Sequence, residues 1–293
     1  DIAVIIVDRE ATPDKPIHLL NITTAADGAT ASHARCLIVA DDGSEVTVLE
    51  EHTSIGGTDY FVNALTEIVI GMNAQVTHYF IEREDRSAIN ISTLKAHQAR
   101  DSRLRSHTVL LGAGLSRNNV NPVLDGENCH SLLNGVYVGN GDQHQDNLMR
   151  VVHAQPHCQS RQFYKGIMTD EAHGVFTGRI VVRKPAQKTD AVQSNQNLLL
   201  SPKSRANTKP QLEIYADDVK CTHGATIGQL DEQAVFYLRS RGMSEQAARG
   251  MLIYAYVLEA LERMEIDPVR NELARDLLGK LPHTEHFEGD LVD

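Results

Sequence analysis

Tryptophan is absent from this 293-residue sequence, and aromatic residues make up only 5% of it. So few rings give little support to a carbohydrate-binding groove. Long hydrophobic runs are also missing, because no stretch approaches the roughly 18 apolar residues that a membrane span needs. We therefore expect a soluble protein that does not enter a membrane.

Basic residues are in deficit. The sequence has 28 Lys and Arg against 39 Asp and Glu, which gives a formal net charge of -11. A field of this sign repels phosphate backbones and acidic membrane surfaces. Neither nucleic acid nor a membrane is an expected partner.

Cysteines are few and scattered. The four of them, Cys36, Cys129, Cys158 and Cys221, include no CxxC pair, and the chain has no charged-then-apolar leader. A disulfide scaffold would be denser, so we expect free thiols and a cytoplasmic location.

Several catalytic motifs are missing too. The sequence has no phosphate-binding loop, no G-x-S-x-G turn and no H-E-x-x-H pair. The segment 112–117 lacks the third glycine and the strand–helix setting of a dinucleotide fingerprint.

Short β-rich segments dominate the chain up to Leu230, and Gly, Asn or Asp separate many of them. Helical periodicity is missing throughout this region, so the crossover helices of a βαβ fold are not available. A sandwich, a barrel or a parallel β-solenoid remains. The segments are 3–7, 36–39, 46–49, 68–70, 76–81, 136–138 and 178–182.

Histidine spacing favours the solenoid among these folds. His107, His130 and His153 are equally spaced, at an interval that fits one coil of a parallel β-helix. Chance also explains an equal spacing among 14 histidines. If the three residues stack, they form a polar track or simply satisfy one another. The polar stretch 186–209 is either a linker or a set of coils with side-chain amide ladders.

The segment 231–293 has a helical pattern. Asp231 and Ser244 suit helix N-termini, Gly242 suits a stop, and Pro268 breaks the second helix. We expect its buried stripe at Ala248, Met251, Leu252, Ala255, Leu258 and Leu261, and a last helix through Leu273, Leu277 and Leu278 before Pro282. A helical segment this short cannot bury enough apolar surface to fold alone, so it must dock on the β body or on another protein. We predict two domains, 1–230 and 231–293.

The sharpest chemical feature is Lys220-Cys221-Thr222-His223-Gly224. In a strand, Cys221 and His223 point to the same face, so a thiolate and an imidazole can bind one soft metal or cluster. Lys220 would favour the thiolate. The alternative is a buried thiol beside a hydrogen-bonded histidine. Two ligands do not complete a four-ligand site, so a partner chain or substrate would have to supply the others.

Other candidates carry weaker signals. The carboxylates Asp125, Glu127, Asp142 and Asp146 would suit a β-helix enzyme that acts on polysaccharide, but nothing in the sequence pairs them. Cys129 next to His130, and His157 next to Cys158, point to opposite faces of a strand and read as structural.

Several motifs, in order, resemble the SufB/SufD family of iron–sulfur cluster assembly proteins. Gly224 after His223 is similar to the SufD branch, since the SufB branch typically has Glu at that position. The motifs are Phe163-Tyr164-Lys165-Gly166, Val175-Phe176-Thr177-Gly178-Arg179-Ile180, Gln187-Lys188-Thr189-Asp190-Ala191, Asn195-Gln196-Asn197-Leu198-Leu199-Leu200-Ser201, Thr208-Lys209-Pro210-Gln211-Leu212-Glu213-Ile214, Cys221-Thr222-His223-Gly224-Ala225-Thr226 and Phe236-Tyr237-Leu238-Arg239-Ser240-Arg241-Gly242.

The resemblance implies a right-handed parallel β-helix followed by a small C-terminal helical domain. It implies a non-catalytic scaffold that acts with SufB and the ATPase SufC, with residues 231–281 as the surface for SufC. His223, with Cys221 beside it, would bind a transient iron–sulfur cluster at the SufB–SufD interface. A flavin on the assembled complex and a homodimer without SufB both stay open. Family members also carry an N-terminal helical region without a counterpart in this sequence.

Overall fold

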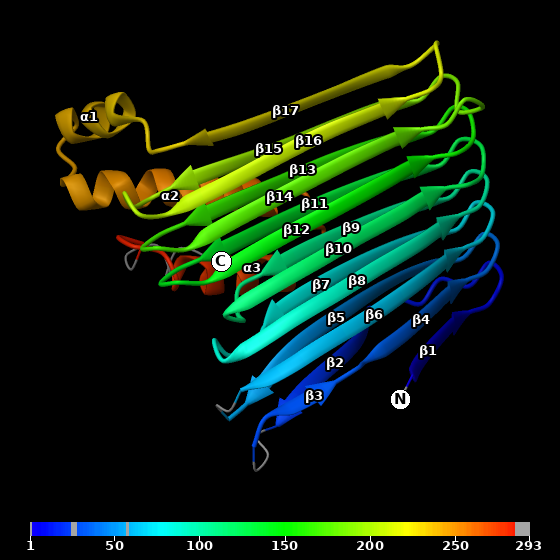
Figure 1. Cartoon of the computed structure of the whole chain (residues 1–293), viewed down its shortest axis with the longest axis horizontal. Coiled ribbons are helices and arrows are strands. Elements are labelled where there is room, and N and C mark those ends of the chain that lie inside the picture. The colour runs from blue at the N-terminus through cyan, green and yellow to red at the C-terminus, as the bar shows by residue number, and fades with distance from the viewer. Residues whose placement is uncertain (1, 25–27, 57–58, 285–293) are drawn as a thin grey trace.

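The computed structural model describes residues 2–24, 28–56 and 59–284, in which strands form two long sheets and three helices follow them (Figure 1). The first sheet runs in the order β1 (Ile2–Val7), β4 (Arg35–Ala40), β6 (Tyr60–Ile70), β8 (Ala88–Gln98), β10 (Leu115–Leu124), β12 (His144–His153), β14 (His173–Val182) and β16 (Arg205–Ile214), with β3 (Thr30–Ser32) beside β6. The second runs in the order β2 (Ile17–Thr24), β5 (Glu45–Ile55), β7 (Gln75–Arg83), β9 (Arg103–Leu110), β11 (His130–Gly139), β13 (Gln159–Met168), β15 (Asp190–Leu199) and β17 (Lys220–Gly228).

From β4 onward, successive strands alternate between the two sheets, and the strands pair in parallel. Each coil of the chain therefore adds one strand to each sheet, which confirms the predicted parallel β-helix with helices at its C-terminal end. Alternate residues of each strand point into the coil. In β12, for example, Gln145, Asn147, Met149 and Val151 are buried, whereas Asp146 and Leu148 between them are half-buried and Arg150 is exposed.

The coil length differs from the spacing of the three histidines. Equivalent positions in the second sheet are Arg103, His130, Gln159, Asp190 and Lys220, so the coils are longer than that spacing and unequal in length. The three histidines do not stack, because they lie on β9, β11 and β12. The prediction of a solenoid was right, but the spacing used for it was a coincidence.

The polar stretch 186–209 is not a linker. It contains β15, and the amides of Asn195 and Asn197 point into the coil. Asn195 Nδ2 donates to the Tyr137 hydroxyl at 3.1 Å, and that hydroxyl donates to Asn197 Oδ1 at 2.6 Å. These polar side chains are thus paired with a partner from another coil, as burial requires.

The helices are α1 (Glu232–Ser240), α2 (Glu245–Leu261) and α3 (Asp267–Leu278). The starts of α1 and α2 and the end of α1 follow the predicted signals, whereas α2 ends at Leu261, well before Pro268, which was predicted to break it. The Asp231 side chain accepts a hydrogen bond from the Gln233 amide, and the Ser244 side chain accepts one from the Ala247 amide. Gly242 has a φ of 96°, a left-handed conformation that glycine adopts without strain, and Pro268 lies in the first turn of α3.

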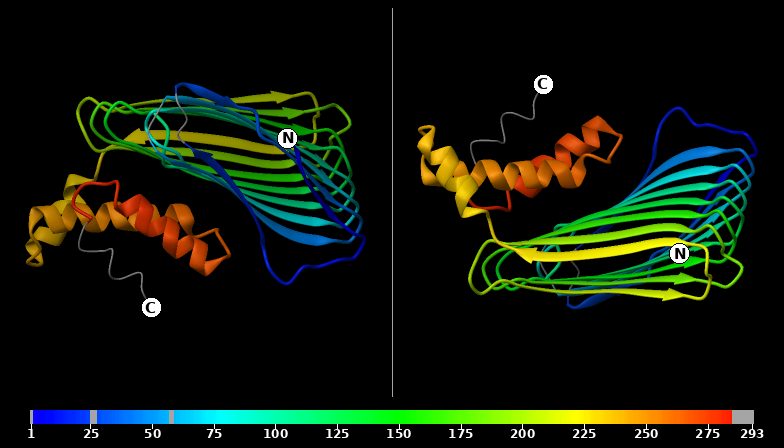
Figure 2. Two further views of the ribbon diagram at one scale, coloured as in Figure 1. Left: turned by 90° about the horizontal axis from the view of Figure 1, so that it is seen from below. Right: turned by 90° about the horizontal axis from the view of Figure 1, so that it is seen from above.

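Helices α2 and α3 pack on the outer face of the second sheet (Figure 2). Tyr79, Val109 and Val136 from the sheet meet Val257 and Leu277 from the helices in one apolar cluster. These two helices therefore dock on the β body of the same chain, one of the two alternatives that the sequence left open.

The buried stripe of α2 differs from the prediction. Ala248 and Leu261 are buried as predicted, and Leu252 and Leu258 are half-buried. Met251 and Ala255 are exposed, and Ile253, Val257 and Ala260 are buried in their place. This helix is apolar around most of its circumference, so periodicity alone did not select the face that meets the sheet.

The strand region ends at Gly228 and the first helix begins at Glu232. The division into domains 1–230 and 231–293 stays a prediction, because the two parts share the apolar cluster described above. Residues 285–293 of the predicted helical domain lie outside the described residues.

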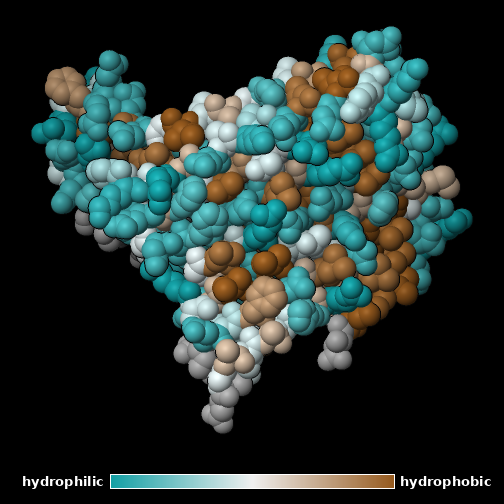
Figure 3. Space-filling model, in the orientation of Figure 1, coloured by the Kyte–Doolittle hydropathy of each residue, from teal (hydrophilic) through white to brown (hydrophobic). Residues whose placement is uncertain are grey.

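At each end of the solenoid, the last strand of each sheet has one edge that pairs with no other strand in the described residues. At the N-terminal end, Ile2, Val4 and Ile6 of β1 point outward and are exposed, and Figure 3 shows hydrophobic surface where Figure 1 places β1 and β4. At the C-terminal end, β16 and β17 close the two sheets. None of the helices in the described residues is both long and apolar enough to cross a membrane.

A glycine-to-alanine change inside the coil tests this packing. A Cβ at Gly166 would lie 2.6 Å from Cε2 of Tyr137, a buried ring held by its hydrogen bond to Asn197. We expect Gly166→Ala to lower the free energy of unfolding by about 1–3 kcal/mol, measured by urea denaturation, because the core has no room for the added methyl group. Gly228→Ala is the control, since a Cβ there meets no atom within 4 Å. Equal stability of the two variants would contradict this account.

Candidate functional site

Cys221 and His223 lie on β17, which pairs with β15 and with no other strand in the described part of the chain. Their register partners are Ala191 and Gln193, both buried inside the coil. Paired residues of neighbouring strands point to the same side of a sheet, so the thiol and the imidazole continue the inner row of side chains at the end of the solenoid. The structure thus brings the two predicted residues together on one face.

The two side chains differ in exposure. Cys221 is half-buried against an apolar cluster that includes Ile180 and Ala191, whereas His223 is exposed. Burial raises the pKa of the Cys221 thiol; a backbone hydrogen bond from Ala191 opposes this effect, and the charge of Asp190 adds to it. The thiol therefore favours its neutral form, contrary to the expectation that Lys220 would favour the thiolate.

The pair has no third donor from the part of the chain that the structure describes, where no group of three or more His, Cys, Asp or Glu side chains is arranged to hold a metal ion. A four-ligand site here needs donors from elsewhere. Access for them exists, because His223 is exposed and the other edge of β17 is not paired with any strand in the described residues.

The structure does not bring the four candidate carboxylates together. Asp125 and Glu127 follow the end of β10, whereas Asp142 precedes the start of β12. Since these two strands run parallel over ten residues, their opposite ends are about 33 Å apart. Asp146 pairs with Arg117 at 2.7 Å. This geometry does not favour a polysaccharide-cleaving pair.

The predicted histidine track is not present. His107 stacks on the Tyr79 ring with 4.8 Å between centroids, and burial lowers its pKa to about 3, with a contribution from Arg105. His153 lies 2.9 Å from the Ser160 hydroxyl, and burial lowers its pKa to about 4. Each is a neutral core residue with its own local contact, and His130 is only half-buried. The three histidines therefore neither form a track nor satisfy one another.

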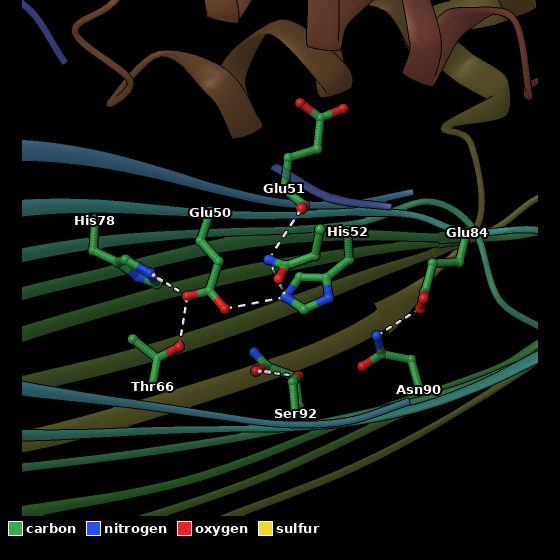
Figure 4. A network of polar contacts seen from close by, with 10 residues as sticks. Glu50, Glu51, His52, Thr66, His78, Glu84, Asn90 and Ser92 are labelled. Atoms are coloured by element: carbon green, nitrogen blue, oxygen red, sulfur yellow. Dashed lines mark hydrogen bonds and ion pairs between the residues drawn. The ribbon is translucent and has the colours of Figure 1, made fainter. Parts of the chain in front are cut away.

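A buried charged cluster was not anticipated from the sequence (Figure 4). The Glu50 carboxylate accepts a hydrogen bond from the Thr66 hydroxyl at 2.6 Å and lies 3.0 Å from Nε2 of both His52 and His78. The one sign of this cluster in the sequence is the alternation in β5, where Glu50 and His52 continue the inward-facing row that begins with Val46 and Val48. Contacts between coils, which sequence does not reveal, complete the cluster.

Opposing effects set the charges in this cluster. Burial alone raises the pKa of Glu50, but hydrogen bonds from His52 and His78 and their charges overcome it and hold that pKa well below the ordinary value of 4.5. Burial lowers the pKa of His52, whereas the hydrogen bond and charge of Glu50 raise it above its ordinary value. The result is a buried ion pair inside the solenoid.

Glu50→Gln tests the cluster. A lowered carboxyl pKa stabilises the folded state fully above pH 4.5, and this contribution is lost as the pH falls below that value. At pH 6, we expect the free energy of unfolding of the variant to be about 3 kcal/mol lower than that of the wild type. This difference should shrink as the pH falls below 4.5. Urea denaturation at several pH values measures both.

The matched control is Glu45→Gln, which changes an exposed carboxylate on the same strand. Its effect should stay within about 0.5 kcal/mol. A Glu50→Gln variant as stable as this control at pH 6 would show that the buried pair contributes nothing.

Comparison with known proteins adds independent information. Residues 21–256 match the family model for the SufBD core domain of the SUF system of FeS cluster assembly. The chain is 35% identical over 280 residues to the iron–sulfur cluster assembly protein SufD of Escherichia coli, covering 95% of this chain and 66% of that protein. It is 37% identical over 281 residues to an iron–sulfur cluster assembly SufBD family protein of Synechocystis, covering 93% and 62%. Identity to the SufD protein of Bacillus subtilis is 28% over 275 residues, covering 92% and 62%.

The chain therefore spans just under two thirds of the length of these relatives. The matched region contains β17 with Cys221 and His223, and it ends within α2. The resemblance found in the motifs is confirmed: the chain belongs to the SufBD core family of the SUF system, and relatives named SufD are among its matches.

Proposed function

We propose that this chain is a SufD-like, non-catalytic scaffold subunit that carries part of the site on which an iron–sulfur cluster is built. The cluster is the cargo of the reaction. The observation that carries the proposal is the position of Cys221 and His223, side by side on an end strand of a SufBD core solenoid.

The chemistry of the two side chains suits this role. A thiolate and a neutral imidazole are both ligands of iron–sulfur clusters. Because burial keeps the Cys221 thiol protonated, the thiol would release its proton only when iron binds, so assembly at this site depends on pH. The His223 side chain is exposed, which leaves it room to turn toward an incoming cluster.

A SufB-like subunit would supply the remaining ligands. The free edge of β17 offers unpaired backbone N–H and C=O groups, which commonly accept a strand of another chain. A partner strand at this edge would lie directly beside Cys221 and His223. The same edge is open to a second copy of this chain when no SufB-like subunit is present.

Helix α1 would bind the ATPase subunit. Since α2 and α3 are occupied with the β body, α1 is the part of 231–281 that stays most accessible, with Phe236 72% and Tyr237 56% exposed. Aromatic side chains of this kind are enriched at protein interfaces. ATP hydrolysis in a SufC-like subunit would then shift the SufB–SufD interface between buried and open arrangements.

His223→Ala tests the cluster site. The variant should assemble with co-expressed SufB-like and SufC-like partners, since the imidazole is exposed and takes no part in the core. We expect the rate of cluster formation to fall about ten-fold or more, because a ligand is lost. Anaerobic reconstitution of the purified complex, followed by visible absorbance, measures the rate, and size-exclusion chromatography reports assembly.

His33→Ala is the matched control, because it removes an exposed histidine near the other end of the solenoid. It should reconstitute at the wild-type rate. Normal cluster formation by an intact His223→Ala complex would rule out the site assignment.

The double variant Phe236→Ala/Tyr237→Ala tests the ATPase surface. It should weaken capture of the SufC-like subunit by about ten-fold, measured as a dissociation constant, and leave the free energy of unfolding nearly unchanged. Met72→Ala, an exposed apolar residue far from α1 in the sequence, is the control. Unchanged affinity of the double variant would mean that the ATPase binds elsewhere.

A further inference from the structure

Cys129 and Cys158 occupy the same position in two neighbouring coils. They immediately precede His130 and Gln159, the paired first residues of β11 and β13. The residue before each cysteine has a left-handed backbone, with φ of 58° at Asn128 and 60° at His157. The two turns thus have the same shape and direct both side chains inward, where both are fully buried.

The two thiols are in contact. Each Sγ lies 3.2 Å from the carbonyl oxygen of Gly126, so the two sulfurs share one acceptor, and each thiol is the largest single influence on the pKa of the other. Neighbouring strands are about 4.8 Å apart, which falls within the range of about 4.4–6.8 Å between Cα atoms that a disulfide requires. A bond between the sulfurs therefore needs little movement of the backbone.

The surroundings give the two thiols different reactivity. The hydrogen bond from Cys158 lowers the pKa of Cys129 to about 7; burial opposes this effect, and the Ser102 hydroxyl assists it. The pKa of Cys158 is raised by the same hydrogen bond and by burial. Cys129 is thus the thiolate near neutral pH, and Cys158 is a protonated thiol beside it.

Close packing alone does not account for this pair. Other coils place small residues at the same turn, such as Ala74, Ser102 and Thr189, each after a residue with positive φ. The position therefore demands a small side chain. It does not demand sulfur, and it does not demand two adjacent thiols whose hydrogen bonding activates one of them.

We propose that Cys129 and Cys158 form a reversible disulfide between neighbouring coils when the protein meets a peroxide. The Cys129 thiolate attacks one peroxide oxygen, which breaks the O–O bond and leaves a sulfenic acid; the hydroxide released takes up a proton to form water. The Cys158 sulfur then attacks the sulfenic sulfur and displaces a second water. Two thiols are oxidised and one hydrogen peroxide is reduced to two waters.

Access and consequence follow from the position of the pair. The thiols lie one residue inside the exposed turn residues Asn128 and His157, so a small opening of the turns admits peroxide. The disulfide would join two coils that hydrogen bonds and packing otherwise hold together, and would constrain the unfolded chain. The oxidised protein should therefore have a higher midpoint of thermal unfolding than the reduced protein.

The experiment uses the full chain, reduced under anaerobic conditions and then treated with hydrogen peroxide. Free thiols are alkylated after denaturation, and peptides are analysed by mass spectrometry. We expect a peptide pair joined through Cys129 and Cys158 that lacks two hydrogen atoms and that a dithiol reductant separates. Cys36 is the internal control, because it is buried without a thiol partner and burial, with the charge of Glu50, raises its pKa to about 12. During peroxide treatment, the free thiol of Cys129 should disappear at least about ten-fold faster than the free thiol of Cys36.

Cys158→Ala separates the two steps. It should give no cross-link and should accumulate a sulfenic acid at Cys129, which dimedone traps. Equal rates for Cys129 and Cys36 in the folded wild type, or a cross-link that forms only in denaturant, would overturn the proposal. The wild-type comparison needs no variant, so a Cys158→Ala chain that fails to fold does not remove the test.

Discussion

Backbone hydrogen bonds between parallel strands of successive coils are the interaction on which the whole molecule depends. Each inner strand pairs with the coil before it and the coil after it, so its backbone groups are used on both edges. Among the described strands, those of the first and last coils keep unpaired edges. This constraint leaves the ends of the solenoid open to partners, and β17, which carries the proposed ligands Cys221 and His223, is one of those ends.

The same stacking explains how a solenoid can hold charge. A polar side chain pointing inward has neighbours from the adjacent coils, so its partners come from the preceding or following turn of the chain. Glu50 meets His78 of the next coil in this way. Tyr137 reaches one coil further, past Gly166, to meet Asn195 and Asn197. The inward His153, which lies 2.9 Å from the Ser160 hydroxyl, is held neutral by burial. The interior therefore accommodates titratable groups either by pairing them or by keeping them uncharged.

The C-terminal helices connect the two proposed interfaces. Packing of α2 and α3 on the outer face of the second sheet places α1 close to the end of β17, since only a few residues separate Gly228 from Glu232 (Figure 1). In the proposed complex, a movement of the ATPase at α1 would act on the Gly228 end of β17, whereas the proposed ligands Cys221 and His223 lie toward the other end of that strand. A population shift of that interface would therefore have to be transmitted along β17 itself.

Local patterns were sufficient for much of this description. Alternating apolar residues predict strands, and Asp231, Ser244, Gly242 and Pro268 predict the helix limits, because each signal acts within a few residues of where it lies. A spacing of two also places Cys221 and His223 on one face of any strand. The folded chain was needed for contacts between coils. Coils of unequal length hide the repeat, so the sequence revealed neither the Glu50 cluster nor the meeting of Cys129 with Cys158. The buried face of α2 also depended on the sheet it meets, since a helix that is apolar on several sides has no preferred face until it packs.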